Sequence, residues 1–180
     1  MRSLPITLDG PMLIEPIVHG DSRGFFLESY RRDALAEFGI AEQFVQDNHS
    51  RSRQGVIRGM HFQPGMAKLL RCARGAILDV LVDIRPDSPG FGQWEGFELS
   101  EDNHRILYCP DGFGHGFCVL SEVADVMYKT STYYDPGLES GFAYDDPQIG
   151  IEWPAGLELI VSPRDAQAPP LAKITAQLPF

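Results

Sequence analysis

The sequence has 180 residues, of which 43% are hydrophobic and 22% are charged, as expected for a folded globular protein. Its 25 acidic and 15 basic residues give a net charge of -10, which argues against a nucleic-acid-binding surface because that would need a basic stripe. The N-terminus lacks the apolar core of a signal peptide, and no run approaches the roughly 20 apolar residues that cross a bilayer. We therefore expect a single domain over residues 1–180, located in the cytoplasm, with neither a nucleic-acid nor a membrane partner.

Strand-length apolar runs separated by turn residues make up most of the chain. The first predicted strand covers residues 24–30, and a helix is predicted over residues 31–39, where Leu35 and Phe38 share one face and Gly39 provides a stop. Eight further strands are predicted in chain order, over residues 44–50, 55–62, 67–73, 75–84, 94–100, 105–110, 115–121 and 124–134.

The number and spacing of these strands predict the fold class. The run at 75–84 alternates imperfectly, which is typical of a strand covered on both faces. Many short strands with regular turn signals are typical of an all-β protein, here a jelly-roll β-sandwich with one or two short helices. The Pro- and Ala-rich tail at 162–180 is expected to wrap the surface of this sandwich.

Two polar residues, His61 and Lys68, interrupt apolar strand-like runs. They are either solvated residues at strand ends, or a base and an electrophile that act on one substrate. A histidine with a carboxylate partner is suited to proton transfer near neutral pH. For His61, and for His115, which also lies in an apolar strand-like run, the sequence offers Asp79, Asp83 and Asp165 as partners and does not choose among them.

The histidines and cysteines do not form a metal-binding pattern. No HxH, HExxH or paired-Cys spacing is present, so we predict no metal ligand and no cofactor. An odd number of cysteines without a framework indicates buried, reduced thiols in the cytoplasm. The residues concerned are His19, His49, His61, His104, His115, Cys72, Cys109 and Cys118.

Tyr128 lies in the predicted strand at 124–134. Strand alternation places it on one face with Thr130, and Lys129 on the other. Such a tyrosine is either a packing residue or, where it faces a polar cavity, a proton donor, because its phenol is protonated at neutral pH.

Arginines are candidate ligands for phosphate oxygens because their planar fork donates two parallel hydrogen bonds. Arg58 lies three residues before His61, so the two side chains face opposite ways unless a bulge at Gly59 re-aims one of them. We expect a local positive cluster within the acidic surface, formed by Arg23, Arg58, Lys68 and Arg71.

Six segments together resemble one known family, the dTDP-4-dehydrorhamnose 3,5-epimerases, which are nucleotide-sugar epimerases on a cupin-like jelly roll. The resemblance runs from about residue 12 to residue 170, and the motifs occur in the order and at the spacing of that family. The segments are GDSRGFFLESY, FVQDNHSRSRQGVIRGMHFQ, KLLRCARGAILDVLVDIRPDSPGFGQWEGFELS, PDGFGHGFCVLSE, YKTSTYYDP and DDPQIGIEWP.

The resemblance implies a substrate and four catalytic residues. The substrate is a 4-keto-6-deoxyhexose on a nucleoside diphosphate, and the reaction passes through an enolate without a metal or cofactor. By resemblance His61 is the base, Asp165 orients it, Lys68 stabilises the C4 oxygen and Tyr128 is the acid on the opposite face.

The resemblance also implies the substrate-binding residues and a homodimer. Arg23, Phe26 and Glu28 would reach from one subunit into the site of its neighbour on exchanged N-terminal strands, for diphosphate binding, base stacking and a pyrimidine N–H. Further contacts to the substrate are implied for Gln46, Asp47, Asn48, Arg58, His115, Tyr134, Glu139 and Arg164.

Two departures from the family pattern leave the product open. The stretch between His61 and Lys68 is about three residues shorter than in the rhamnose-pathway enzymes, and Arg164 stands where lysine is common. A single-centre C3 or C5 epimerase for another deoxysugar is therefore an alternative. A metal-dependent cupin and a non-catalytic sugar-nucleotide binding module are the remaining readings.

Overall fold

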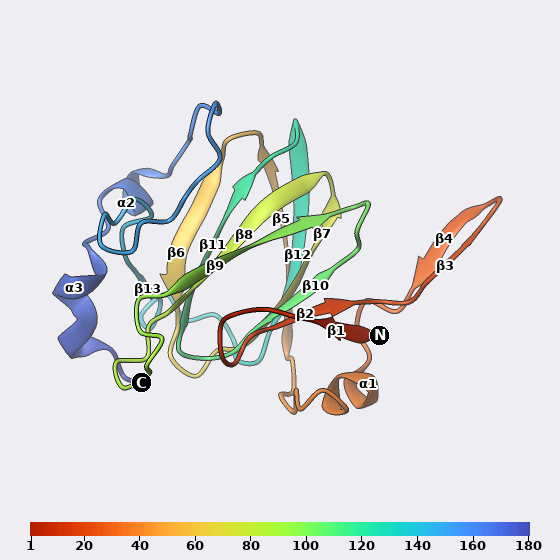
Figure 1. Cartoon of the computed structure of the whole chain (residues 1–180), viewed down its shortest axis with the longest axis horizontal. Helices are drawn as coiled ribbons and strands as arrows, with labels where there is room; N and C mark the ends of the chain where they lie inside the picture. Colours follow the sequence, from red (N-terminus) through yellow and green to blue (C-terminus); the bar gives the residue numbers. More distant parts are fainter.

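The computed structural model describes residues 1–180 and contains two antiparallel sheets that pack face to face (Figure 1). This confirms the predicted all-β sandwich. In order across the sheet, the six-stranded sheet consists of β1 (Arg2–Leu4), β2 (Met12–Glu15), β10 (Ile106–Cys109), β7 (Lys68–Arg74), β12 (Val123–Thr130) and β5 (Gln46–Arg53). The five-stranded sheet consists of β13 (Ser140–Gly141), β6 (Ile57–Phe62), β11 (Phe113–Val119), β8 (Ala76–Asp83) and β9 (Trp94–Ser100).

The helices are short and lie outside the sheets. The predicted helix at 31–39 forms as α1 (Arg32–Ala36), whose Leu35 is buried beneath it. The C-terminal tail adds α2 (Pro163–Ala166), α3 (Leu171–Ile174) and a 3-10 helix (Thr175–Gln177), which were not predicted because four-residue helices have no clear periodicity. None of these helices has the length and apolar character needed to cross a membrane.

Three apolar clusters hold the sandwich together. The largest lies between the sheets and includes Leu70, Ile77 and Phe117, so each sheet buries one face against the other. A second cluster packs Leu35 of α1 on the outside of the six-stranded sheet. A third packs Leu171 of the tail on the outside of the five-stranded sheet. Strand β8 is therefore covered on both faces, as its imperfect alternation predicted.

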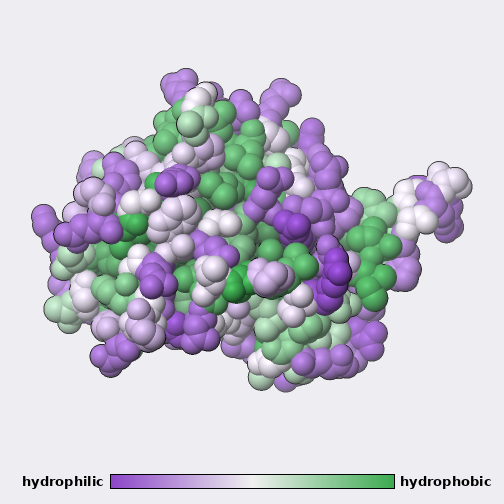
Figure 2. Space-filling model, in the orientation of Figure 1, coloured by the Kyte–Doolittle hydropathy of each residue, from purple (hydrophilic) through white to green (hydrophobic).

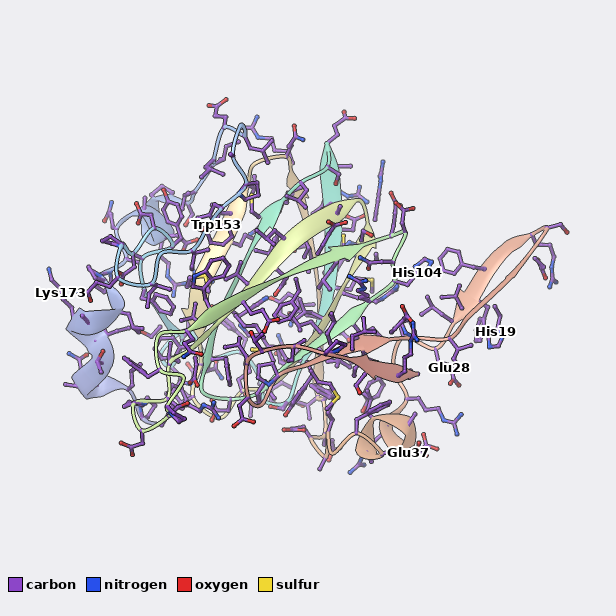
Figure 3. All side chains as sticks on the ribbon, in the orientation of Figure 1. His19, Glu28, Glu37, His104, Trp153 and Lys173 are labelled. Atoms are coloured by element: carbon purple, nitrogen blue, oxygen red, sulfur yellow. The ribbon has the colours of Figure 1, made fainter.

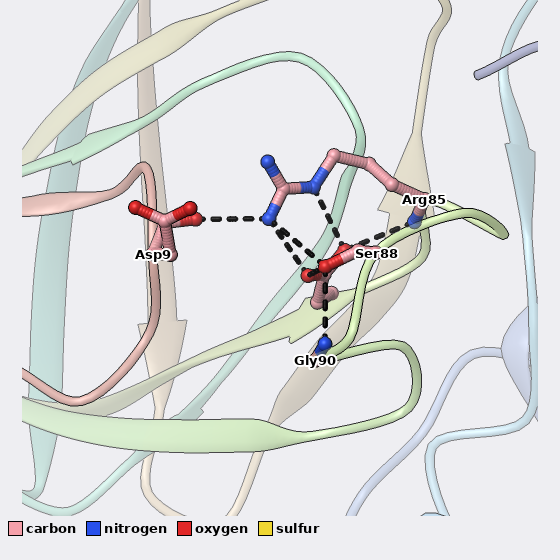
Figure 4. Close-up of polar contacts among 5 residues, drawn as sticks. Asp9, Arg85, Ser88 and Gly90 are labelled. Atoms are coloured by element: carbon pink, nitrogen blue, oxygen red, sulfur yellow. Dashed lines mark hydrogen bonds and ion pairs between the residues drawn. The ribbon is translucent and has the colours of Figure 1, made fainter.

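A buried polar network fixes the turn after β8. Arg85 donates to both oxygens of Asp83 and to the backbone carbonyl of Asp9, which ties the turn to the N-terminal segment (Figure 4). Ser88 donates to Asp83 and accepts from the backbone of Gly90. Since every partner is a fixed turn group, Asp83 serves the structure of this corner of the sandwich.

Strands β3 (Val18–Asp21) and β4 (Gly24–Leu27) form a separate antiparallel hairpin, here called the arm, that projects away from the sandwich (Figure 1). Phe25 and Phe26 of the arm are 60% and 66% exposed. Figure 2 shows the arm as a narrow extension with apolar surface at its base. Both aromatic rings therefore lie mostly in solvent, on a hairpin outside the sandwich.

Candidate active site

A cavity of about 610 Å³ lies between the two sheets and is lined by residues from both. This is the usual size of a small-molecule site. Eleven of the fifteen predicted site residues line it: Gln46, Asn48, Arg58, His61, Lys68, His115, Tyr128, Tyr134, Glu139, Arg164 and Asp165.

His61 and Asp165 form a hydrogen-bonded pair at the wall of the cavity. His61 lies on β6, and its Nε2 is 2.6 Å from Oδ1 of Asp165. Asp165 is held by α2, whose N-terminal residue Ser162 accepts a hydrogen bond from the Asp165 backbone N–H at 3.1 Å. Because Asp165 is buried, its carboxylate fixes the imidazole and leaves Nδ1 as the nitrogen without a carboxylate partner.

The other two aspartates that the sequence offered to His61 or His115 do not bind His61. Asp79 lies 3.0 Å from His115 Nε2, so the cavity wall contains a second carboxylate–imidazole pair. Asp83 is engaged by Arg85 in the turn after β8. The pairing of His61 with Asp165, which the family resemblance implied, is the one that the structure contains.

The remaining histidines lie apart from the cavity. His49 contacts Asp125 on the outer face of the sheet, and His104 packs on Phe25 of the arm with ring centroids 4.5 Å apart. Figure 3 shows His19 on the arm itself. No group of three or more His, Cys, Asp or Glu side chains gathers in a way that could hold a metal ion.

Lys68 and Tyr128 line the cavity from the six-stranded sheet, on β7 and β12. Tyr128 lies opposite Leu70 of β7 and Asn48 of β5. Burial raises the pKa of the Tyr128 phenol, and the nearby Glu139 carboxylate raises it further, so the phenol keeps its proton at neutral pH. As alternation predicted, Thr130 also lines the cavity, whereas Lys129 binds Asp47 at 2.6 Å and is not among the residues that line it.

A bulge in β6 brings Arg58 and His61 into the same cavity. Arg58 pairs with Phe117 of β11 and His61 pairs with His115, so three steps along β6 match two steps along β11. Gly59 has a φ of +134° at this point, and a Cβ there would lie 2.5 Å from the Gly116 backbone. The bulge at Gly59, which Arg58 and His61 need in order to face the same way, is therefore present.

A ring of polar contacts forms the rim of the cavity. Glu139 accepts hydrogen bonds from the Tyr134 hydroxyl at 3.1 Å and from Arg164 at 2.5 Å. The Tyr134 backbone N–H donates to the side-chain oxygen of Gln46, whose amide group donates to Asn48. These contacts hold an aromatic ring, a carboxylate and a guanidinium side by side at the entrance.

Four predicted site residues lie outside this cavity. Arg23 forms an ion pair with Asp21 near the tip of the arm, Phe26 is exposed on the arm, and Figure 3 shows Glu28 where the arm returns to the body. Asp47 binds Lys129 instead. For these four residues, contact with a substrate stays a prediction.

The expected positive cluster is only partly present. Arg58 and Lys68 line the cavity, but Arg23 lies on the arm and Arg71 does not line the cavity. On β7, Arg71 is three positions beyond Lys68, so alternation turns it to the other face, where it approaches the Met127 sulfur. The expectation for Arg71 was wrong, and Arg164 supplies the third cavity cation.

Gln63 is a cavity residue that the sequence reasoning missed. It is 5% exposed, donates to the Tyr133 carbonyl at 3.0 Å and accepts from the Asp135 N–H at 2.9 Å. It thereby supports the loop that carries Tyr134. Gln63 is two residues after His61, so strand alternation was a signal that could have identified it.

Comparison with known proteins gives a consistent result over nearly the whole chain. The family model for dTDP-4-dehydrorhamnose 3,5-epimerase matches residues 5–173. The dTDP-4-dehydrorhamnose 3,5-epimerase of Escherichia coli K12 is 47% identical over 169 residues, covering 92% of this chain and 91% of the relative. The dTDP-4-dehydrorhamnose 3-epimerase of Streptomyces niveus is 44% identical over 177 residues, covering 96% and 85%.

A solved structure is similar in the same way. The crystal structure of a dTDP-6-deoxy-D-glucose-3,5-epimerase from Legionella pneumophila Philadelphia 1, in complex with dTDP-4-keto-L-rhamnose, superposes with a TM-score of 0.95 at 46% identity. It covers 98% of this chain and 95% of its own.

Proposed function

The chain belongs to the dTDP-4-dehydrorhamnose 3,5-epimerase family, and we propose that it inverts both C3 and C5 of a dTDP-4-keto-6-deoxyhexose through an enolate. Members of this family are isomerases of dTDP-sugars in rhamnose biosynthesis, and the chain is one of them. The assignments of individual residues that follow are our proposal.

The ketone at C4 makes the hydrogens on C3 and C5 acidic, because the electron pair released at carbon spreads onto the oxygen. In the proposed mechanism His61 Nδ1 takes the proton, while Asp165 stabilises the imidazolium that forms. The Lys68 ammonium stabilises the charge that develops on the C4 oxygen. The Tyr128 phenol then returns a proton to the other face of the carbon, which inverts it.

One observation carries this proposal: His61 and Tyr128 reach the same cavity from different sheets. An epimerase must remove a proton from one face of a carbon and deliver one to the opposite face. A base on β6 and an acid on β12, facing a space between them, meet that requirement. A binding module would have no need for two opposed proton-transfer groups.

The rim of the cavity is suited to the nucleoside diphosphate. We propose that Arg58 and Arg164 bind phosphate oxygens and that Tyr134 stacks on the base. Gln46, Asn48, His115 and Glu139 complete the polar wall, and Asp47 acts from the neighbouring position on β5. These cations offset, close to the substrate, the repulsion from a net charge of -10.

We also propose that two copies of the chain exchange their arms. Strand β5 ends the six-stranded sheet and pairs with β12 only, so one of its edges is unpaired beside the cavity. The arm carries exposed Phe25 and Phe26, and an unpaired edge attracts another strand. In this arrangement Arg23, Phe26 and Glu28 reach the partner's cavity, and residues 1–180 act as one catalytic domain per subunit.

The cysteines support a proposal for the cellular compartment. All three are free and buried, and we propose a cytoplasmic location, where thiols stay reduced.

The test uses dTDP-4-keto-6-deoxyglucose and the protein in D2O, without a reductase. Mass spectrometry counts the deuterons that enter the sugar, and NMR assigns them to carbons. Deuterium at both C3 and C5 is the expected result. Deuterium at C3 alone would instead support the single-centre reaction named for the Streptomyces niveus relative. A folded protein that introduces no deuterium would overturn the proposal.

A further inference from the structure

A buried chain of three side chains leads from the interior of the sandwich to the cavity. Asp79 on β8 is fully buried, and its Oδ2 lies 3.0 Å from His115 Nε2 on β11. His115 is 9% exposed, and its other nitrogen, Nδ1, lies 3.5 Å from Lys68 Nζ on β7. The chain therefore starts in the five-stranded sheet and ends at a lysine of the six-stranded sheet.

The hydrogen bonds of this chain have a direction. The Asp79 carboxylate only accepts, so His115 Nε2 carries a proton and donates it. A neutral imidazole that is protonated at Nε2 has a lone pair at Nδ1, which accepts from the Lys68 ammonium. One N–H of Lys68 is thus occupied by His115, and the other two can point into the cavity.

The charges of the chain balance. Burial lowers the pKa of Lys68, and the nearby negative groups, Asp79 among them, oppose that change. Burial also lowers the pKa of His115, which keeps its imidazole neutral between the two ions. Burial also raises the pKa of Asp79, whose Oδ1 has no hydrogen-bond partner, while His115 and Lys68 act to lower it. With both ends charged, Asp79 and Lys68 form a carboxylate–ammonium pair separated by one neutral ring.

Few other groups near Lys68 can supply a negative charge that stabilises its ammonium. Cys109 on β10 is its neighbour, but burial raises the pKa of this thiol to about 12, so it is neutral. Glu139 at the rim is already bound to Arg164. On the other side, His61 pairs with His115 across β6 and β11 and supplies no negative charge. This leaves Asp79 as the counter-charge that has no competing cation.

We propose that Asp79 is a positioning residue for the epimerase reaction. It holds His115 in the tautomer that accepts from Lys68, and it provides the negative charge that keeps Lys68 protonated beside the ketone oxygen. The inference rests on the proposed function, because it assumes that Lys68 stabilises the enolate. The sequence offered Asp79 only as one of three possible carboxylate partners for His61 or His115, and no role toward Lys68 followed from that.

The first test replaces Asp79 by asparagine, which keeps the shape and removes the charge. An amide can donate to His115 Nε2, so the tautomer is no longer fixed. Without the counter-charge, the pKa of Lys68 falls. We expect a kcat about 10- to 100-fold lower at neutral pH, with KM changed less than about threefold. Since an active Lys68 must be protonated, the alkaline limb of the kcat–pH profile moves to lower pH by about one unit or more.

A direct measurement separates this inference from the proposed function. NMR titration of the Lys68 side chain, in protein labelled at lysine, gives its pKa in the wild type and in Asp79→Asn without any substrate. If the wild type introduces no deuterium into the sugar, the proposed function fails, whatever the titration shows. If the wild type is active and Asp79→Asn leaves both the Lys68 pKa and the alkaline limb unchanged, the role of Asp79 is overturned.

Two further variants guard against a purely structural effect. Asp83→Asn removes a buried carboxylate from the same strand, but its partner Arg85 faces the turn rather than the cavity. We expect this control to lower the melting temperature and leave the Lys68 titration unchanged. If Asp79→Asn does not fold, His115→Phe removes both the nitrogen that donates to Asp79 and the one that accepts from Lys68. The pKa of Lys68 must then fall, and an unchanged value would contradict the proposal.

Discussion

His61 Nε2 lies 2.6 Å from Asp165 Oδ1, although 104 residues separate the two in the sequence. The carboxylate comes from a helix of four residues that Ser162 caps, and the imidazole comes from a strand. The short helix α2 in the C-terminal tail thus sets the orientation of the proposed base.

Replacing Asp165 by asparagine tests that orientation. The amide removes the charge that stabilises the imidazolium and can donate to Nε2, which favours the wrong tautomer of His61. We expect kcat to fall by about 100- to 10,000-fold, with binding of dTDP nearly unchanged. Deuterium uptake from D2O measures the proton-transfer step directly. Asp145→Asn, an exposed acid in a turn outside the cavity lining, is the matched control and keeps wild-type rates. Equal rates in the two variants would contradict the role of Asp165.

Tyr128→Phe removes the proposed acid and leaves the base intact. His61 can still remove a proton and return a deuteron to the same face, so exchange continues while inversion stops. We expect deuterium in recovered starting sugar and a loss of epimerised product of about 100-fold or more. NMR of the sugar distinguishes the two outcomes. Tyr144→Phe, whose ring lies outside the cavity lining, serves as the control. Epimerised product formed at the wild-type rate would assign the acid to another group.

The arm is tested by making its exposed aromatic residues charged. A double substitution, Phe25→Asp with Phe26→Asp, prevents the arm from packing on an apolar partner surface. We expect the variant to sediment as a monomer and to bind dTDP at least about tenfold more weakly, because the arm brings Arg23 to the partner's site. As a control, Leu138→Asp places a charge at another residue, which is 53% exposed. We expect this control to sediment with the same mass as the wild type. A wild type that is itself a monomer would rule out arm exchange.

Asp125 links stability to pH. Hydrogen bonds from Arg51, at 2.7 and 2.8 Å, and the contact with His49 hold the pKa of this carboxyl well below its usual range. A folded-state pKa that is depressed stabilises the protein above the unfolded-state pKa of about 3.9, and this contribution is lost as the pH falls further. Asp125→Asn should therefore lower the unfolding free energy at pH 7, with a difference from the wild type that shrinks below about pH 4. Urea unfolding between pH 3 and pH 7 measures it.

The strands and parts of the site follow from local pattern, because alternation and turn residues act over a few positions. Tyr128 and Thr130 share the cavity face as alternation requires, and the bulge that Arg58 needed occurs at a glycine with positive φ. The prediction that Arg71 joins the positive cluster was wrong because it considered charge alone. Strand alternation from Lys68 turns Arg71 to the opposite face.

Long-range pairings could not be derived in the same way. Three aspartates were equally possible partners for His61 and His115, and only the packing of α2 against β6 selects Asp165 for His61. The pairing of Asp79 with His115 depends on the register of β8 and β11, which no local pattern specifies. The arm shows the same limit, since Phe26 is 66% exposed and Phe25 stays 60% exposed although it packs on His104.

The two sheets of the sandwich each carry one half of the proposed chemistry. The distance between the sheets therefore affects the reaction. Facing sheets lie about 10 Å apart, at a distance set by the side chains packed between them, such as Ile77 and Phe117. A displacement of 1 Å between reacting groups can cost about 100-fold in rate. Core residues that never touch the sugar therefore act as spacers, and their volumes tune the reach of the base and the acid toward each carbon.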